Sequence, residues 1–179
     1  MTKISHPPYV HSFPAPAVLI GCGTLEHPNL ITCSWFGTVC SEPPLVSVSV
    51  RKSRFSHHLI AEHREFTVNL PRIRDMEAVK YCGATSGRVV NKFDDLKLTP
   101  VVCPPLEHAP MIAEFFHVLG CRVRHIIELG SHDMFVAEVV SVQCSEEDRR
   151  SAKPDPHCEE QIVYLDGKYW SLKPMIDHS

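Results

Sequence analysis

The stretch HPNLITCSWFGTVCSEPP, residues 27–44, alternates like a β-strand but carries an unusual set of side chains. Successive side chains of a strand point to opposite faces, so even-numbered and odd-numbered positions form two separate faces. No charged residue lies between Asn29 and Ser41. Thr32 and Ser34 carry small hydroxyl groups where a half-buried strand usually has Lys or Glu. We expect this face to line a dry slot with a polar edge.

The composition bounds the class of protein. A chain of 179 residues predicts a single domain over residues 1–179. The 18 basic and 21 acidic residues give a formal charge of −3, which argues against nucleic acid or an anionic membrane surface as partner. No apolar run approaches the roughly 18 residues of a membrane helix, and no signal peptide is visible. The sequence therefore predicts a cytoplasmic protein.

Cysteine and histidine are abundant, but their spacing does not predict a metal site. The eight cysteines include no C-x-x-C pair and most lie in apolar runs, so we expect reduced, buried thiols without disulfides. The segment SHHLIAEH places His58 and Glu62 on one helical face, while His63 lies off it. A solvent-facing side of a helix explains these residues better than metal ligation.

The order of the expected elements predicts the fold class. Strands are expected at 17–24, 30–39, 45–50 and 66–71, and β-rich stretches at 114–130 and 133–144 joined by a tight turn. Helices are expected within 53–65, with Ser53 or Ser56 as N-cap, and at 74–83, ending at Gly83. Residues 146–160 read as an exposed loop, and 161–172 as a hairpin turning at Asp166–Gly167. This pattern predicts a mainly β protein, a barrel with a few short appended helices.

A dinucleotide fingerprint is not supported. The segment GCGTLE, residues 21–26, follows a strand but lacks the third glycine, and Pro28 stands where a helix should begin.

Two stretches combine cations with hydroxyl groups. In SVRKSRFSHH, residues 49–58, three basic residues interleave with two serines at the start of a helix, which suits a phosphate group; a solvated helix face is the alternative. In TSGRVVNKF, residues 85–93, a glycine loop carries a serine and two cations, and a plain surface turn is the alternative. With residues 27–44 they predict a ligand that has a phosphate at one end and a flat, uncharged body at the other. Thr32 and Ser34 would then hydrogen-bond the edge of its ring.

The ordered set of motifs resembles one known family. The succession PAPAVLIGCG, PNLITCSWFGTVCSEPPLVSVSVRKSRFSHHLI, EFTVNLP, SGRVVNKF and LGSHDMFVAEVV is similar to the flavin reductase-like, FMN-binding split-barrel family, and closest to its flavoredoxin branch. The similarity covers residues 13–172. It implies a split β-barrel that forms a homodimer and binds FMN near the subunit interface.

The resemblance also implies roles for individual residues. Those expected along the isoalloxazine ring and ribityl chain are Asn29, Ile31, Thr32, Ser34 and Trp35. Those expected at the phosphate are Arg51, Lys52, Ser53 and Ser56, with Ser86, Gly87 and Lys92 closing over it. His132 matches a histidine near the nicotinamide in reductase members. Asn91 and Ser131 stand where the family often has Asp.

The favoured hypothesis is an FMN-dependent oxidoreductase that takes a hydride from NADH or NADPH and passes electrons onward. The first alternative is a flavoredoxin-like FMN electron carrier reduced by a redox protein partner. A flavin-free barrel that acts as a binding module is a third.

The opening strand also predicts a two-fold symmetric homodimer with its flavin at or beside the interface. The interior of a small barrel is filled by its own side chains, so the ring is expected outside it and covered by the helices or a second subunit. Trp35 falls on the face opposite Thr32 and Ser34, so contact with the ring requires a twist or bulge in this strand.

Overall fold

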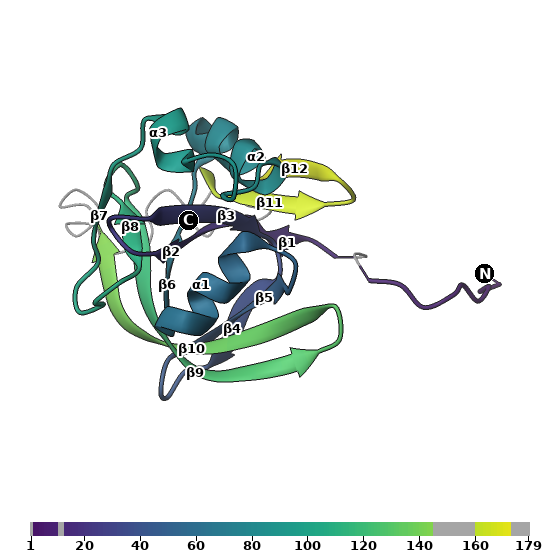
Figure 1. Cartoon of the computed structure of the whole chain (residues 1–179). Helices are drawn as coiled ribbons and strands as arrows, with labels where there is room; N and C mark the ends of the chain where they lie inside the picture. The colour runs from purple at the N-terminus through teal and green to yellow at the C-terminus, as the bar shows by residue number, and fades with distance from the viewer. Residues whose placement is uncertain (1, 11–12, 145–159, 173–179) are drawn as a thin grey trace, which may run out of the picture.

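The main sheet of the computed structural model, which describes residues 2–10, 13–144 and 160–172, has seven antiparallel strands (Figure 1). Their spatial order is β3-β2-β6-β9-β10-β5-β4. Their bounds are β2 Val18–Gly23, β3 Pro28–Cys33, β4 Phe36–Cys40, β5 Leu45–Arg51, β6 Glu65–Asn69, β9 His117–Leu129 and β10 His132–Cys144.

The two edges of this sheet meet at one short link. β3 and β4 lie at opposite ends of the strand order, yet only Ser34 and Trp35 join them. The three Cα–Cα steps from Cys33 to Phe36 span at most about 11 Å, so the sheet must curl until its edges are neighbours. Register shifts in β10 beside Val136 and Val139 give the long strands the bend that a curled sheet needs. The mainly β, split-barrel prediction is confirmed.

The strand predicted over 30–39 is wrong in one respect, because the chain leaves the sheet at Ser34–Trp35 and re-enters it as β4. The Trp35 carbonyl accepts a hydrogen bond of 2.9 Å from the Ser49 N–H, so the link is tied to β5 instead of continuing the ladder with β2. One continuous strand could not serve both edges of the sheet.

Alternate residues of the strands fill the barrel. The interior cluster includes Val18, Ile20, Ile31, Cys33, Val48, Val50, Phe66, Val68, Val123 and Phe135. On the outer side of β3, Leu30 packs with Ala78, Cys82 and Phe93 of the covering helices. β3 is therefore buried on both faces, which accounts for its lack of charge.

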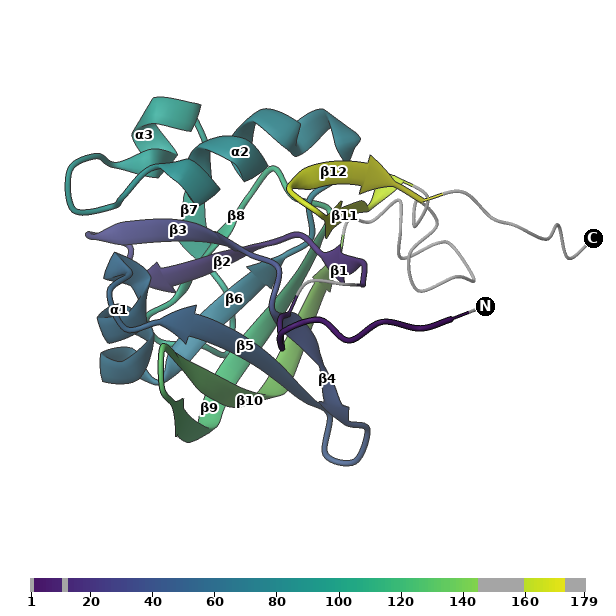
Figure 2. The ribbon, with the colours of Figure 1, turned by 90° about the vertical axis from the view of Figure 1, so that its right-hand side faces the viewer.

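The helices lie outside the barrel (Figure 2). They are α1 Phe55–His63, the short 3₁₀ helix η1 Ile73–Asp75, α2 Met76–Ala84 and α3 Lys92–Leu96. The predicted N-cap of α1 is wrong: Arg54 holds that position without a side-chain cap, and Ser56 lies inside the helix. α2 continues one residue beyond Gly83, because its C-cap is Thr85. α3 was not predicted, and the Asn91 side chain caps it by accepting from the Phe93 N–H at 3.1 Å.

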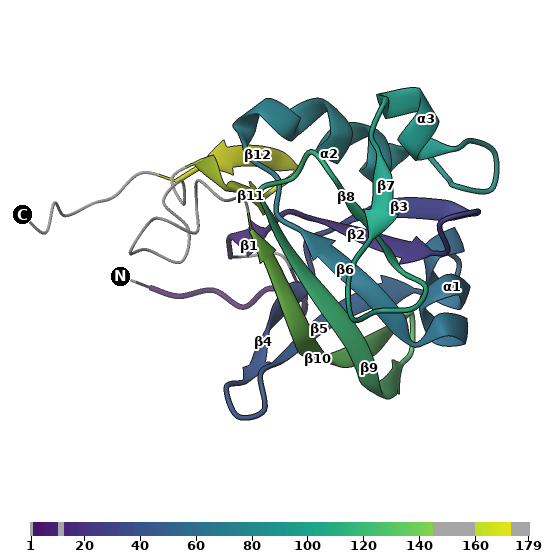
Figure 3. The same ribbon diagram turned by 90° about the vertical axis from the view of Figure 1, so that its left-hand side faces the viewer.

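Smaller sheets complete the described part of the fold (Figure 3). β1 Ala15–Pro16, β11 Ile162–Leu165 and β12 Lys168–Ser171 form one, and β7 Pro100–Val102 and β8 Pro110–Ile112 form the other. The hairpin at Asp166–Gly167 is confirmed, and both residues have the positive φ that a type I′ turn requires. The loop predicted at 146–160 lies outside the described residues except for Glu160. None of the described helices is long and apolar enough to span a membrane.

Most of the described cysteines are buried. Five are buried, Cys40 is half-buried and Cys144 is exposed; Cys158 lies outside the described residues. Burial raises the pKa of the Cys22 thiol to about 11 and that of Cys33 to about 12, so both stay protonated at neutral pH.

Candidate functional site

Two adjoining clefts lie where the barrel is split. The first, of ≈ 580 Å³, is lined by the β3 edge, by β5 and α2, and by four aromatic rings, so we call it the aromatic cleft. The second, of ≈ 400 Å³, is lined by the turn before α1 and by the loop after α2 and includes three serines, so we call it the serine cleft. The residues that line both clefts are Ile31, Arg51, Arg54 and Gly83. The pair therefore forms one elongated site.

Aromatic rings from three separate segments wall the aromatic cleft. Trp35 comes from the link between β3 and β4, and its ring centroid lies 4.3 Å from that of His132 at the start of β10. Tyr164 and Tyr169 come from the β11–β12 hairpin, with ring centroids 5.3 Å apart. Because the chain leaves the sheet after β3, Trp35 lines the same cleft as Thr32 and Ser34. This departure is the twist or bulge that contact between Trp35 and the ring was expected to require.

The edge of β3 forms one side of the aromatic cleft. Among the described strands β3 pairs only with β2, so its other edge offers backbone N–H and C=O groups. The Thr32 hydroxyl donates to the Val79 carbonyl of α2 at 2.6 Å. Because the hydroxyl hydrogen is already used in this bond, the Thr32 oxygen can only accept a hydrogen bond from a ligand in the cleft.

The cations near the clefts differ in whether they already have partners. Arg51 and Arg54 are exposed and line both clefts, and neither guanidinium pairs with another described residue. Lys92 is 3% exposed, and its Nζ donates to the carbonyls of Leu30 at 2.6 Å and Cys82 at 3.1 Å. Burial lowers the pKa of Lys92. The two arginines are therefore the cations best placed for an anionic ligand.

Lys52 lies outside both clefts. Its Nζ is 3.0 Å from Glu128 Oε2 and 3.4 Å from Asp133 Oδ1, on the side of the turn away from the clefts. The sequence grouped Lys52 with its neighbours by position alone, whereas the turn directs Arg51 and Arg54 into the site and Lys52 away from it.

Asn29 supports the serine cleft from beneath. It is 3% exposed, and its Nδ2 donates to Ser56 Oγ at 2.8 Å. A Cβ added to Gly87 would lie 2.1 Å from Asn29 Oδ1, so the backbone of the loop after α2 passes directly over this amide. Asn29 therefore fixes the floor of the cleft and does not line it.

His132 is oriented by its neighbours. Its Nδ1 lies 2.9 Å from Ser131 Oγ, so Ser131 supplies a hydrogen-bond partner to the ring. Burial, and then the charge of Arg51 opposite it on β5, lower the pKa of His132. The imidazole is neutral at pH 7.

The structure brings most of the predicted residues together. Those that line the two clefts are Ile31, Thr32, Ser34, Trp35, Arg51, Ser53, Ser56, Ser86, Gly87, Lys92 and His132. Further lining residues that the sequence did not assign include Arg54, Lys80, Thr85, Tyr164 and Tyr169. Arg54 stood in the cationic stretch, but no pattern in the sequence places the C-terminal hairpin beside β3.

Fold and site together define a split β-barrel with one elongated site at the split. The aromatic cleft forms one end of this site, and Arg51 and Arg54 lie where it joins the serine cleft. The family model for the flavin reductase like domain matches residues 10–173, and the chain belongs to this family.

Named relatives cover much of the chain. An uncharacterized protein of Archaeoglobus fulgidus is 36% identical over 130 residues, which are 73% of this chain and 72% of that protein. The reductase component of the 4-nitrophenol 4-monooxygenase/4-nitrocatechol 2-monooxygenase of Rhodococcus opacus is 35% identical over 63% of this chain and 56% of its own. The crystal structure of flavoredoxin from Methanosarcina acetivorans matches with a TM-score of 0.89 at 28% identity, covering 100% of this chain and 96% of that one.

Proposed function

We propose that the chain is an FMN-dependent oxidoreductase that reduces the flavin with NADH or NADPH and passes the electrons onward. One observation carries the proposal: two guanidinium groups that pair with no described residue lie where an aromatic-walled cleft joins a serine-lined one. An elongated ligand with a flat body and a phosphate fits that distribution of charge and apolar surface.

The residues present fit this cofactor. Arg51 and Arg54, with the hydroxyls of Ser53 and Ser86, would hold the phosphate. The flat ring would lie in the aromatic cleft, where the β3 edge offers backbone hydrogen bonds and Trp35 and the tyrosines exclude water. Bound FMN would supply the hydride and electron chemistry, so the chain has to bind, orient and shield.

His132 is proposed to position the nicotinamide. Its imidazole lines the aromatic cleft and is held by Trp35 and Ser131. A neutral ring can hydrogen-bond an amide without opposing the positive charge that a nicotinamide gains when it donates a hydride.

The second candidate is an FMN electron carrier reduced by a protein partner. The match to a flavoredoxin over the whole chain favours it, and the carrier needs the same FMN site. Anaerobic addition of NADH or NADPH to the FMN-loaded protein separates the two: rapid bleaching of the flavin band supports the reductase, and no bleaching with either supports the carrier.

A homodimer is also proposed, with FMN at or beside its interface. A groove of ≈ 710 Å³ adjoins the aromatic cleft and shares Trp35 with it. Phe13 lines the groove at 66% exposure, and Trp35 is 36% exposed. Exposed apolar rings around a groove are typical of an interface. A cytoplasmic setting stays a prediction.

The experiment for the phosphate end compares two flavins. Arg51→Gln and Arg54→Gln are each expected to weaken FMN binding by about 1.5–3 kcal/mol, the scale of a charge-assisted hydrogen bond. Binding of riboflavin, which lacks the phosphate, should be unchanged. Fluorescence titration measures both, with Lys168→Gln on the far hairpin strand as control. Equal FMN affinity in wild type and both arginine variants would contradict this assignment.

A separate experiment addresses His132. We expect His132→Asn to slow flavin reduction by NAD(P)H about tenfold, the worth of one hydrogen bond, with unchanged FMN affinity. Because the pKa of His132 is lowered, the wild-type rate should be level from pH 7 to 8 and fall only below about 6.5. Stopped-flow absorbance measures the rate, with His125→Asn on β9 as control. A rate in His132→Asn equal to wild type would remove this residue from the reaction.

A further inference from the structure

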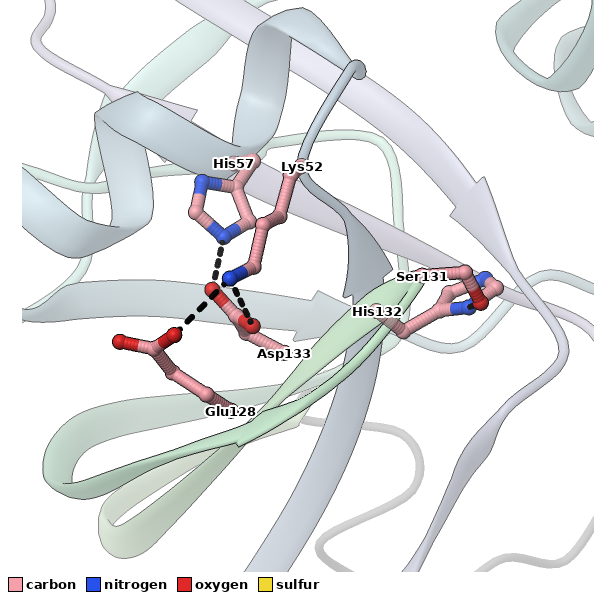
Figure 4. Close-up of polar contacts among 6 residues, drawn as sticks. All are labelled: Lys52, His57, Glu128, Ser131, His132 and Asp133. Carbon is pink, nitrogen blue, oxygen red and sulfur yellow. Dashed lines mark hydrogen bonds and ion pairs between the residues drawn. The ribbon is translucent and has the colours of Figure 1, made fainter.

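A buried carboxylate stands on the opposite side of β10 from the site. His132 faces the aromatic cleft, and the next residue, Asp133, points the other way, as adjacent residues of a strand do (Figure 4). Asp133 is 5% exposed and lies two residues before Phe135 of the barrel interior. An acidic residue at the end of an interior row needs partners, because burying an unpaired charge is costly.

Both partners of Asp133 come from one short segment, residues 52–57, which runs from the turn before α1 into its first residues. Its Oδ2 lies 2.8 Å from His57 Nε2, and its Oδ1 lies 3.4 Å from Lys52 Nζ (Figure 4). Residues 52 and 57 enclose four consecutive residues, 53–56, and all four line the serine cleft. One carboxylate therefore holds both ends of the segment that forms a wall of the site.

A second contact holds the His57 ring in place beside Asp133. The His57 ring also meets the fully buried Phe135 ring edge-on, with centroids 5.3 Å apart. Burial alone raises the pKa of Asp133, but the hydrogen bond with His57 and the nearby Lys52 ammonium outweigh it and lower that pKa. The carboxylate is ionised at neutral pH, as the ion pair with Lys52 requires.

The ion pairs among Lys52, Glu128 and Asp133 are not arranged to add much to the stability of the fold. Asp133 Oδ1 accepts no hydrogen bond from the described residues and has only the ion pair. Buried ion pairs are weak contributors to stability, and they are best attested as devices that fix one arrangement. Glu128, the other partner of Lys52, is 78% exposed in its side chain, so that pair adds little.

We propose that Asp133 is a positioning residue, which holds the 52–57 segment through Lys52 and His57 so that Ser53 and Arg54 face the ligand. The inference rests on the proposed function, since it takes the ligand at this wall to be the FMN phosphate. Asp133 itself touches neither cleft.

The test is Asp133→Asn, which keeps the shape of the side chain and removes its charge. We expect the Kd for FMN to rise about tenfold, the worth of one hydrogen bond, and the Kd for riboflavin to change less than twofold. Glu128→Gln makes the same change at the other Lys52 partner and should alter neither value. Lys52→Met removes only one of the two contacts of Asp133, so it should weaken FMN binding no more than Asp133→Asn does. The double variant should be no weaker than Asp133→Asn alone, because the loss of the carboxylate charge already removes the pair with Lys52.

Three results would overturn the proposal: an FMN Kd in Asp133→Asn within twofold of wild type, equal weakening of FMN and riboflavin, or additive losses in the double variant. If Asp133→Asn does not fold, Lys52→Met breaks the Lys52–Asp133 contact alone, from a half-exposed position. If the wild-type chain binds no FMN, the proposed function fails by itself. Amide hydrogen exchange then tests the anchor without ligand: faster exchange confined to 52–57 in Lys52→Met supports it, and unchanged exchange refutes it.

Discussion

Neighbouring cations in this chain have different partners although they are chemically alike. Lys92 is held by two backbone carbonyls and Lys52 by two carboxylates, whereas Arg51 and Arg54 pair with no described residue. A guanidinium is weakly hydrated and can bind a phosphate through two parallel hydrogen bonds. The pairing of each side chain therefore identifies the candidate ligand-binding residues better than the number of cations does.

Gly87 makes a residue-scale prediction. A methyl group there would meet Asn29 Oδ1 at 2.1 Å and Phe55 at 2.9 Å, so the loop or the buried amide has to move. We expect Gly87→Ala to weaken FMN binding at least tenfold, since it disturbs the Asn29–Ser56 hydrogen bond beneath the cleft. Val89→Ala, in the same loop but outside both clefts, is the matched control.

Val89 is 78% exposed and lines neither cleft. Val89→Ala should leave FMN binding unchanged and change the free energy of unfolding by less than about 0.5 kcal/mol. Fluorescence titration and urea unfolding measure the two effects. Equal FMN binding in both alanine variants would show that the loop does not depend on the close approach at Gly87.

At the scale of elements, β3 and α2 determine the width of the aromatic cleft. β3 packs its inner face in the barrel and its outer face on α2, and its free edge borders the cleft. α2 contributes Lys80, Gly83 and Ala84 to the opposite wall. The hydrogen bond from Thr32 to Val79 joins these two elements directly.

Thr32→Val tests this link. The substitution keeps the branched shape and removes the hydroxyl, so we expect the free energy of unfolding to fall by about 0.5–1.5 kcal/mol. Thr38→Val is the control, because Thr38 is exposed on β4 and should change stability by less than about 0.5 kcal/mol. Urea unfolding followed by circular dichroism measures both. Equal stability of the two variants would mean that this bond contributes nothing net.

On the scale of the whole molecule, one site is assembled from segments distant in sequence. The β3–β4 link, the turn before α1, the end of α2 and the C-terminal hairpin all reach the split of the barrel. The adjoining apolar groove opens between Val10 with residues 13–16 on one side and the β11–β12 turn on the other. A second subunit over this groove would cover the exposed face of Trp35.

The dimer gives the prediction at this scale. We expect sedimentation equilibrium to give twice the chain mass of 20.2 kDa, and Phe13→Asp to shift the protein toward monomer because it places a charge in the apolar groove. Val102→Asp alters another exposed apolar residue, on β7 outside the groove, and should remain dimeric. A stable 20.2 kDa wild-type monomer that still holds FMN would show that one chain completes the site.

The sequence by itself determined the fold class and most of the cleft. Alternation along the strands and the turn at Asp166–Gly167 predicted a mainly β barrel, because these signals depend on neighbouring residues. The family resemblance of the ordered motifs implied that the barrel is split. The serines and Gly87 were also predicted, since their motifs lie within short segments that each reach the cleft intact.

Only the tertiary structure decided which partners the polar groups have. The curl of the sheet brings β3 to β5 and breaks the predicted strand at Ser34–Trp35. Because α2 packs against β3, the Thr32 hydroxyl donates its hydrogen bond to the Val79 carbonyl. The ion pair with Asp133 holds Lys52 outside the site. A periodic pattern fixes the face to which a side chain belongs, but its partner lies in a distant segment whose position depends on the register and curvature of the whole barrel.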